Sequence, residues 1–146
     1  MKQVYIDTNI FLYANEKKSS YQVSCNKLIQ LLIKNKVEIL TNAETVQEII
    51  YYSQKISRIN FGIKISNQLL TIVTTLISID KELLLNFLKL IKKNIHHKNI
   101  ESRDFLHIAT CLQYKISTLI TFDKQFKKIK EIISQTPEEY LKEYKD

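Results

Sequence analysis

Glycine is almost absent from this chain, since Gly62 is the only one among 146 residues. Phosphate-binding loops such as GxGxxG and GxxxxGKS/T need several glycines, because their backbone N–H groups must come close to the ligand. The chain cannot build such a loop, which excludes the common nucleotide-binding α/β classes. If the protein handles phosphate, it must do so through a metal ion or through side chains.

Cysteine and long apolar runs are also scarce. Cys25 and Cys111 are the only cysteines, and their spacing fits neither a disulfide framework nor a metal site. No apolar stretch approaches the roughly 20 residues that span a bilayer. The opening residues, MKQVYID, lack the apolar core of a signal peptide. These features predict a cytoplasmic protein in a reducing setting, without a membrane segment.

Arginine is rare, with only Arg58 and Arg103, yet lysine gives the chain a net charge of +7. Excess positive charge favours an anionic partner such as nucleic acid. It also keeps a protein soluble, so charge alone does not separate the two readings. Hydrophobic residues make up 45% and charged residues 25% of the sequence, the balance of a soluble globular protein. The length predicts one domain, spanning 1–146.

Short apolar strands alternate with amphipathic helices along the chain. We predict strands at 4–7, 37–40, 77–79, 117–121 and 131–134, helices at 20–35, 41–56, 60–76, 80–94 and 102–115, a helix opening near Ile10 and a helical turn at 123–128. This alternation predicts a parallel sheet covered by helices. In such sheets ligands bind beyond the carboxyl ends of the strands. Asp7 and Asp123 both fall at such ends.

These two acids each have a structural reading beside a functional one. Asp7 ends the stretch VYID and could cap the following helix, but Thr8 and Asn9 lie closer and are equally good caps. Capping therefore does not require Asp7, which favours a functional role. Asp123 could cap the turn DKQF, and taken alone that reading is the simpler one.

Asp104 lies on the helix predicted at 102–115. Ser102 is a good N-cap for this helix. Asp104 then falls in the first turn, where the helix macrodipole favours a negative charge. His107 and Cys111 share its face, and apolar residues fill the adjacent stripe. We therefore expect its carboxylate to face the sheet edge more than open solvent.

Glu44 and Glu48 share one helix face, so their roles must be separated. Thr41 and Glu44 match a capping box, in which each side chain bonds the other residue's backbone N–H. Glu44 thus has a structural role at the helix start. Glu48 lies one turn deeper and has no such role, which makes it the better candidate for a site.

Acids that converge on one edge repel each other strongly. Two unit charges ~4 Å apart at an effective dielectric of ~20 cost about 4 kcal/mol. Such a cluster persists when protons or cations neutralise it, and Mg²⁺ or Mn²⁺ suit a site made of oxygen ligands. Asn9 and Thr121 could contact such an ion through water. An acidic metal site in a basic protein suits a polyanionic substrate.

Four blocks of the chain resemble, in order, the signature blocks of PIN-domain ribonucleases: VYIDTNIFLYA, AETVQEI, SRDFLHIA and TLITFDKQF. The resemblance is greatest to the VapC-type toxins of bacterial and archaeal toxin–antitoxin pairs. Each block alone is weakly specific, but all four in order are strongly so. The positions that match the family pattern are Asp7, Asn9, Glu48, Ser102, Asp104, Thr121, Asp123 and Phe126.

The resemblance implies a three-layer α/β/α sandwich with a short parallel central sheet. It implies hydrolysis of RNA phosphodiester bonds with Mg²⁺ or Mn²⁺, in which the catalytic residues Asp7, Glu48 and Asp104 would bind the metal or hold its waters. Asp123 would bind a weaker second metal or lie just outside the ligands. The residues that would support these ligands are Asn9, Thr121 and Ser102. A cognate antitoxin is also implied. A homodimer through an apolar helix face is expected because the dimer is the commonest closed assembly.

Other segments carry no such signal. The helices within 56–100 are expected to cover one wall of the RNA groove. His96 and His97 are expected on different helix faces, not as a metal pair. His107 is interpreted as a packed or hydrogen-bonded helix residue, since metal-dependent hydrolysis needs no histidine base. The tail at 138–146 is interpreted as a solvated helix face.

Three alternatives to a toxin stay open. The first is a PIN nuclease that matures or degrades RNA without an antitoxin. The second is an RNA- or protein-binding domain that has lost catalysis, although a repelling acid cluster has little purpose without metal. The third is a phosphatase with Asp7 as nucleophile, but those enzymes usually carry a second acid two residues on, where this chain has Asn9.

Overall fold

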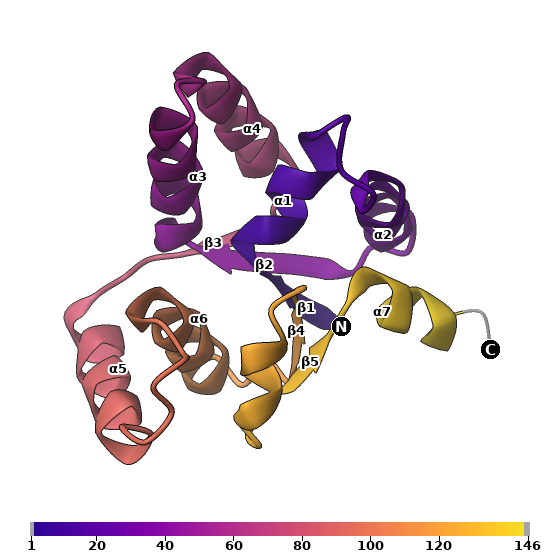
Figure 1. The fold of residues 1–146 in the computed structure, drawn as a ribbon. Coiled ribbons are helices and arrows are strands. Elements are labelled where there is room, and N and C mark those ends of the chain that lie inside the picture. Colours follow the sequence, from indigo (N-terminus) through magenta and orange to yellow (C-terminus); the bar gives the residue numbers. More distant parts are fainter. Residues whose placement is uncertain (1, 145–146) are drawn as a thin grey trace.

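The computed structural model describes residues 2–144 and is built around a five-stranded parallel sheet in the order β3-β2-β1-β4-β5 (Figure 1). The strands are β1 (Gln3–Ile6), β2 (Glu38–Asn42), β3 (Thr75–Ile77), β4 (Thr118–Ile120) and β5 (Ile133–Gln135). The helices are α1 (Thr8–Asn15), α2 (Gln22–Lys34), α3 (Ala43–Lys55), α4 (Ile59–Ile72), α5 (Lys81–Lys93), α6 (Ser102–Gln113), the short η1 (Lys124–Lys128) and α7 (Pro137–Glu143).

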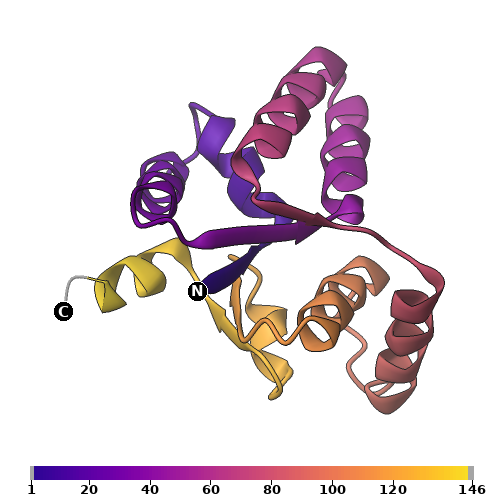
Figure 2. The same ribbon diagram turned by 180° about the vertical axis from the view of Figure 1, so that it is seen from behind.

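Helices cover both faces of the sheet. The helices α1 to α4 and α7 lie on one side, and α5, α6 and η1 lie on the other (Figure 1 and Figure 2). The predicted α/β/α sandwich with a short parallel sheet is therefore confirmed. Two apolar cores lie on opposite faces of the sheet, the first under α1, α2 and α4 and the second under α5 and α6. Along β1, Val4 and Ile6 pack into the first core and Tyr5 packs into the second. A strand buried on both faces explains why VYI has no polar alternation.

The single glycine permits a close approach of α3 and α4. Gly62 is buried in α4, and a Cβ at this position would lie 2.6 Å from the Cβ of Ser53 on α3. That distance is shorter than any ordinary contact, so a side chain here would push the two helices apart. Gly62 thus fixes α4 against α3, the helix that carries Glu48.

Several predicted boundaries are wrong by a few residues. The predicted helix 60–76 ends at Ile72, and the strand placed at 77–79 is β3 (Thr75–Ile77). The β-branched residues after Ile72 join the sheet and do not continue the helix, because the N–H of Thr74 donates to the Ile39 carbonyl at 2.9 Å. The strand placed at 131–134 is β5 (Ile133–Gln135), and β2 continues past 40 to Asn42.

The tail is not a fully solvated helix face. A capping box between Thr136 and Glu139 starts α7. Tyr140 is only 2% exposed, because it packs into the first core. Lys145 and Asp146 lie outside the described residues.

Both cysteines are buried free thiols. None of the helices within 2–144 is long and apolar enough to cross a membrane.

Candidate metal centre

A pocket of about 280 Å³ lies at the carboxyl end of the central strands. Its lining includes all four acids that the sequence singles out, which are Asp7, Glu48, Asp104 and Asp123. They come from the end of β1, from α3, from the first turn of α6 and from the segment after β4. Residues far apart in sequence therefore meet in one place, as parallel strand ends predict.

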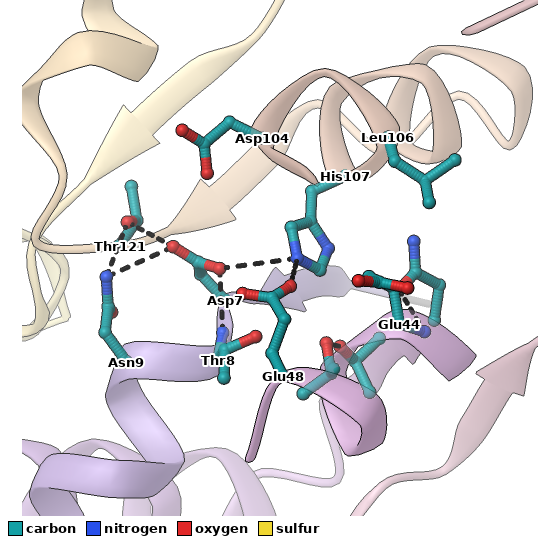
Figure 3. Close-up of polar contacts among 12 residues, drawn as sticks. Asp7, Thr8, Asn9, Glu44, Glu48, Asp104, Leu106, His107 and Thr121 are labelled. Atoms are coloured by element: carbon teal, nitrogen blue, oxygen red, sulfur yellow. Dashed lines mark hydrogen bonds and ion pairs between the residues drawn. The ribbon is translucent and has the colours of Figure 1, made fainter. Parts of the chain in front are cut away.

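Asp7 is held from several sides. It is only 5% exposed. Its Oδ1 accepts the Thr8 N–H at 2.7 Å, and its Oδ2 accepts from the Thr121 hydroxyl at 2.7 Å and the Asn9 amide at 3.1 Å (Figure 3). Burial raises the pKa of Asp7, and the neighbouring His107 and Thr121 partly offset this effect. Asn9 and Thr121 thus contact the acid that they were expected to support.

The expectation that capping does not require Asp7 is wrong. Asp7 is the N-cap of α1, with extended backbone angles and a side chain that bonds the first helical N–H. The helix starts at Thr8, immediately after the strand, so Thr8 is already inside it and cannot cap it. One carboxylate therefore both starts the helix and lines the pocket.

His107 is the site residue that the sequence missed. It is fully buried on α6, and its Nε2 lies 2.5 Å from Oε1 of Glu48 and 3.8 Å from Oδ1 of Asp7 (Figure 3). Its Nδ1 lies 2.6 Å from the Tyr5 hydroxyl. His107 is hydrogen-bonded, as expected, but it also joins two of the acids. Its position one helical turn after Asp104 was the available signal.

The ionisation of His107 follows from these neighbours. Burial alone would lower its pKa, but the hydrogen bond to Glu48 and the charges of Asp7 and Glu48 together raise it. When it is protonated, the imidazole donates from both ring nitrogens, to Glu48 on one side and to the Tyr5 hydroxyl on the other. In that state its positive charge offsets part of the repulsion among the acids.

The capping box expected between Thr41 and Glu44 is not formed. Asn42 is the N-cap of α3 and accepts the Glu44 N–H at 3.1 Å. Thr41 is the penultimate residue of β2, where its hydroxyl donates to the Ile6 carbonyl at 3.0 Å. Glu48 lines the pocket and Glu44 does not. The preference for Glu48 thus agrees with the structure, although the reason given for it was wrong.

The start of α6 also differs from expectation. Glu101, not Ser102, is the N-cap, and Asp104 completes a capping box by accepting the Glu101 N–H at 3.3 Å. Ser102 is exposed and lies outside the pocket lining, so it does not support the acids as expected. Burial, then the charges of Asp7 and Asp123, raise the pKa of Asp104 to about 7.

Asp123 has the capping role that was the simpler reading. Its Oδ1 accepts the Gln125 N–H at 2.9 Å and starts η1. Its own N–H donates to the Thr121 hydroxyl at 3.0 Å, which links it to Asp7 through one side chain. Asp123 therefore combines a structural contact with a place in the pocket.

The donor set fits a hard divalent cation. Among residues 2–144, no three His, Cys, Asp or Glu side chains are arranged to hold a metal ion as they stand. Mg²⁺ does not need three, because it is usually bound by one or two carboxylates and keeps several waters. Burial first, and then the charges of Asp7 and Asp123, hold the pKa of Asp104 near 7, and a cation beside Asp7 and Asp104 would offset those charges. The anionic groups of the lining are all carboxylates, and their oxygens suit Mg²⁺ or Mn²⁺.

One further expectation is met only in part, and another is wrong. The residues within 56–100 do not line this pocket, although Phe61 of α4 lines a smaller cavity beside it. His96 and His97 lie in the turn after α5, not on helix faces, and their ring centroids are 4.1 Å apart.

The raised pKa of Asp104 predicts how stability depends on pH. In the unfolded chain this carboxyl has a pKa of 3.8, whereas the folded protein holds the proton up to about pH 7. Folding therefore takes up a proton between these values, so this contribution to stability is lost as pH rises through about 7. In chelator, we expect thermal melts of Asp104→Asn to change less with pH across this window. Equal pH slopes in both proteins would contradict the assignment.

Comparisons with known proteins agree with this geometry. The family model of the PIN domain matches residues 4–132, so the chain belongs to the PIN domain family. It is 21% identical over 122 residues to Ribonuclease VapC23 of Mycobacterium tuberculosis. The aligned region covers 82% of this chain and 92% of that protein.

Solved structures share the fold. The structure of VapBC2 from Rickettsia felis bound to a promoter DNA fragment has a TM-score of 0.74, with 21% identity over 92% of this chain and 98% of the other. DNA-bound VapBC from Salmonella typhimurium gives 0.75, with 12% identity over 94% and 99%. VapC20 of Mycobacterium tuberculosis, a toxin that cleaves the sarcin-ricin loop, gives 0.71, with 11% identity over 86% and 93%.

Proposed function

We propose that this chain is a metal-dependent endoribonuclease and the toxin of a toxin–antitoxin pair. It would act in the cytoplasm as one domain spanning 1–146. The observation that carries the proposal is the convergence of four carboxylates in one pocket of a chain with a net charge of +7. Membership of the PIN domain family and the ribonuclease name of a relative support it.

The acids have distinct tasks in this proposal. Asp7 and Asp104 would hold Mg²⁺ or Mn²⁺, and Asp123 would hold a second, weaker ion or a water. When bound, such an ion supplies a Lewis acid for the phosphodiester and lowers the pKa of a bound water. Glu48 is fixed through one oxygen by His107, and its other oxygen would orient the attacking water. Water adds to phosphorus, the bond to the 3′ oxygen breaks and that oxygen takes a proton, which leaves a 5′-phosphate.

Glu48 and Glu44 provide a matched test of this function. Both are glutamates on one face of α3, but only Glu48 lines the pocket. On induced expression in bacteria, we expect wild type and Glu44→Gln to arrest growth and degrade RNA on a gel. Glu48→Gln should lose both effects, because a neutral amide cannot orient the water in the same way. Activity retained in Glu48→Gln and lost in Glu44→Gln would place the site one turn closer to the helix start.

A nuclease with an accessible metal pocket harms its own cell, so we propose a cognate antitoxin that covers the pocket. An Arg guanidinium binds a carboxylate with two hydrogen bonds, so the antitoxin should bring such a group to Asp7 or Asp104. We also propose a homodimer through an apolar helix face, such as the exposed Leu84, Leu85 and Leu88 of α5.

The partner can be tested by co-expression with the product of the neighbouring upstream gene. We expect affinity purification of the chain to recover a complex without RNase activity, and dissociation of the partner to restore the activity. Recovery of an active, unbound nuclease from cells that grow normally would remove the toxin assignment. It would leave a housekeeping nuclease, and absence of activity in any state would leave an RNA-binding domain.

A further inference from the structure

One wall of the acidic pocket is basic and aromatic. Tyr51, Tyr52 and Lys55 of α3 and Arg103 of α6 line it beside the four acids. Lysine and arginine attract phosphate, and aromatic rings stack with bases. A wall of this composition suits the nucleotides that flank the cleaved bond.

Arg103 is prepared to bind an anion. Its guanidinium carbon lies 4.8 Å from the centroid of the Tyr51 ring, and Nζ of Lys55 lies 5.9 Å from the same ring. Among the described residues, neither cation is within 4.0 Å of a carboxylate oxygen. Arg58, in contrast, pairs with Glu16 at 3.0 Å. The contact with the ring restrains the Arg103 guanidinium, and its N–H groups can bind the paired oxygens of a phosphate.

A small aromatic hollow adjoins this wall. Its volume is about 120 Å³, and it shares Asn9, Leu12 and Tyr52 with the acidic pocket. Tyr13, Phe61 and Glu16 complete its lining, and the Glu16 carboxylate is paired with Arg58. Pockets that enclose a whole small ligand start at roughly 300 Å³. The hollow can therefore admit the ring of a base but not a complete nucleotide.

We propose that this wall and hollow form a nucleotide subsite for single-stranded RNA. Arg103 and Lys55 would bind a phosphate that flanks the cleaved one, and Tyr52 would stack with an unpaired base at the mouth of the hollow. Tyr52 is 41% exposed and borders both cavities, so a base can reach it from the acidic pocket. The proposal rests on the nuclease function and selects unpaired RNA, because bases inside a duplex are already stacked.

Binding of a short fluorescent single-stranded RNA tests the subsite. All variants carry Asp7→Asn to prevent cleavage, in buffer with Mg²⁺. We expect Tyr52→Leu to weaken binding about 10-fold, within the range of base–aromatic stacking, and Tyr52→Phe to keep the affinity. The control is Tyr114→Leu, which removes an equally exposed tyrosine at the far end of α6 and should change nothing. A duplex of the same sequence should bind more weakly, and Tyr52→Leu should not change its affinity.

The salt dependence of binding tests the phosphate contact separately. Arg103→Gln should lower the slope of log affinity against log salt by about 0.7, the value for one phosphate of a single strand. Lys34→Gln removes the same charge from the exposed last turn of α2 and should leave the slope unchanged. General attraction to a basic protein would give both variants the same small effect and overturn the contact.

The outcomes separate the two proposals. If the protein without Asp7→Asn cleaves RNA but Tyr52→Leu and Arg103→Gln bind and cleave normally, the subsite is wrong and the nuclease stands. If the wild type neither binds nor cleaves single-stranded RNA, both proposals fail. If Tyr52→Leu loses only the affinity for a protein partner, the hollow belongs to that partner and the RNA subsite is overturned.

Discussion

Replacing Asp7 with Asn is expected to abolish RNA cleavage while the fold survives. Asp7 is buried in the pocket, and two side chains and one backbone N–H hold its carboxylate. Its charge would attract the cation, and an amide cannot replace that charge. Loss of several kcal/mol of charge stabilisation corresponds to at least about 10³-fold in rate, at ~1.4 kcal/mol for each tenfold.

The fold should survive because Asn caps helices as well as Asp. Asp80→Asn is the matched control: Asp80 is the N-cap of α5, accepts the Leu83 N–H at 2.8 Å and lies outside the pocket lining. Cleavage of a labelled RNA and thermal melts of both variants provide the measurement. We expect similar melting temperatures and loss of activity only in Asp7→Asn. Activity of Asp7→Asn within tenfold of wild type would contradict the role of Asp7.

Replacing His107 with Leu is expected to reduce both stability and activity. The imidazole is buried between the Tyr5 hydroxyl and the Glu48 carboxylate. Leu leaves both groups without this partner, and each buried polar group left unpaired costs roughly 1–3 kcal/mol. We expect a loss of about 2–5 kcal/mol in urea unfolding. Cleavage should fall as well, because Glu48 is no longer held in position.

Tyr5→Phe separates the two effects. It removes only the hydroxyl on the far side of the imidazole and keeps the bond between His107 and Glu48. We expect Tyr5→Phe to lose stability but to keep most of the activity. Equal losses of activity in Tyr5→Phe and His107→Leu would show that His107 acts through the core and not through Glu48.

The sequence was sufficient for the layers and for the place of the site. The strand VYI has no polar alternation because both faces of β1 are buried, and its end carries Asp7 to the ligand edge. Asp7, Asp104 and Asp123 stand at the ends or starts of elements, so topology brings them together, and Glu48 joins them from the interior of α3. Their catalytic roles, and that of the metal, remain predictions.

Some helix starts could not be read from the sequence, because a cap depends on where the preceding strand stops. Thr41, Asn42 and Asp7 are all good caps by residue type. Thr41 is excluded because β2 continues to Asn42, which pairs with Ile77 of β3. The same long-range pairing places β3 at Thr75–Ile77 and not at the predicted 77–79.

The role of His107 depended on contacts that the sequence does not show. Glu48 is 59 residues away and Tyr5 is 102 residues away. A histidine on an apolar helix face is usually a packed core residue, and only the fold shows which groups meet its two nitrogens. Its position three residues after Asp104 was compatible with either reading.

Calorimetric titration of Mn²⁺ into the purified protein tests the metal site most directly. We expect wild type and Asp80→Asn to bind Mn²⁺ with equal affinity. Asp7→Asn and Asp104→Asn should each bind it more weakly while melting as folded proteins. Unchanged Mn²⁺ affinity in both pocket variants would show that these carboxylates do not hold the metal.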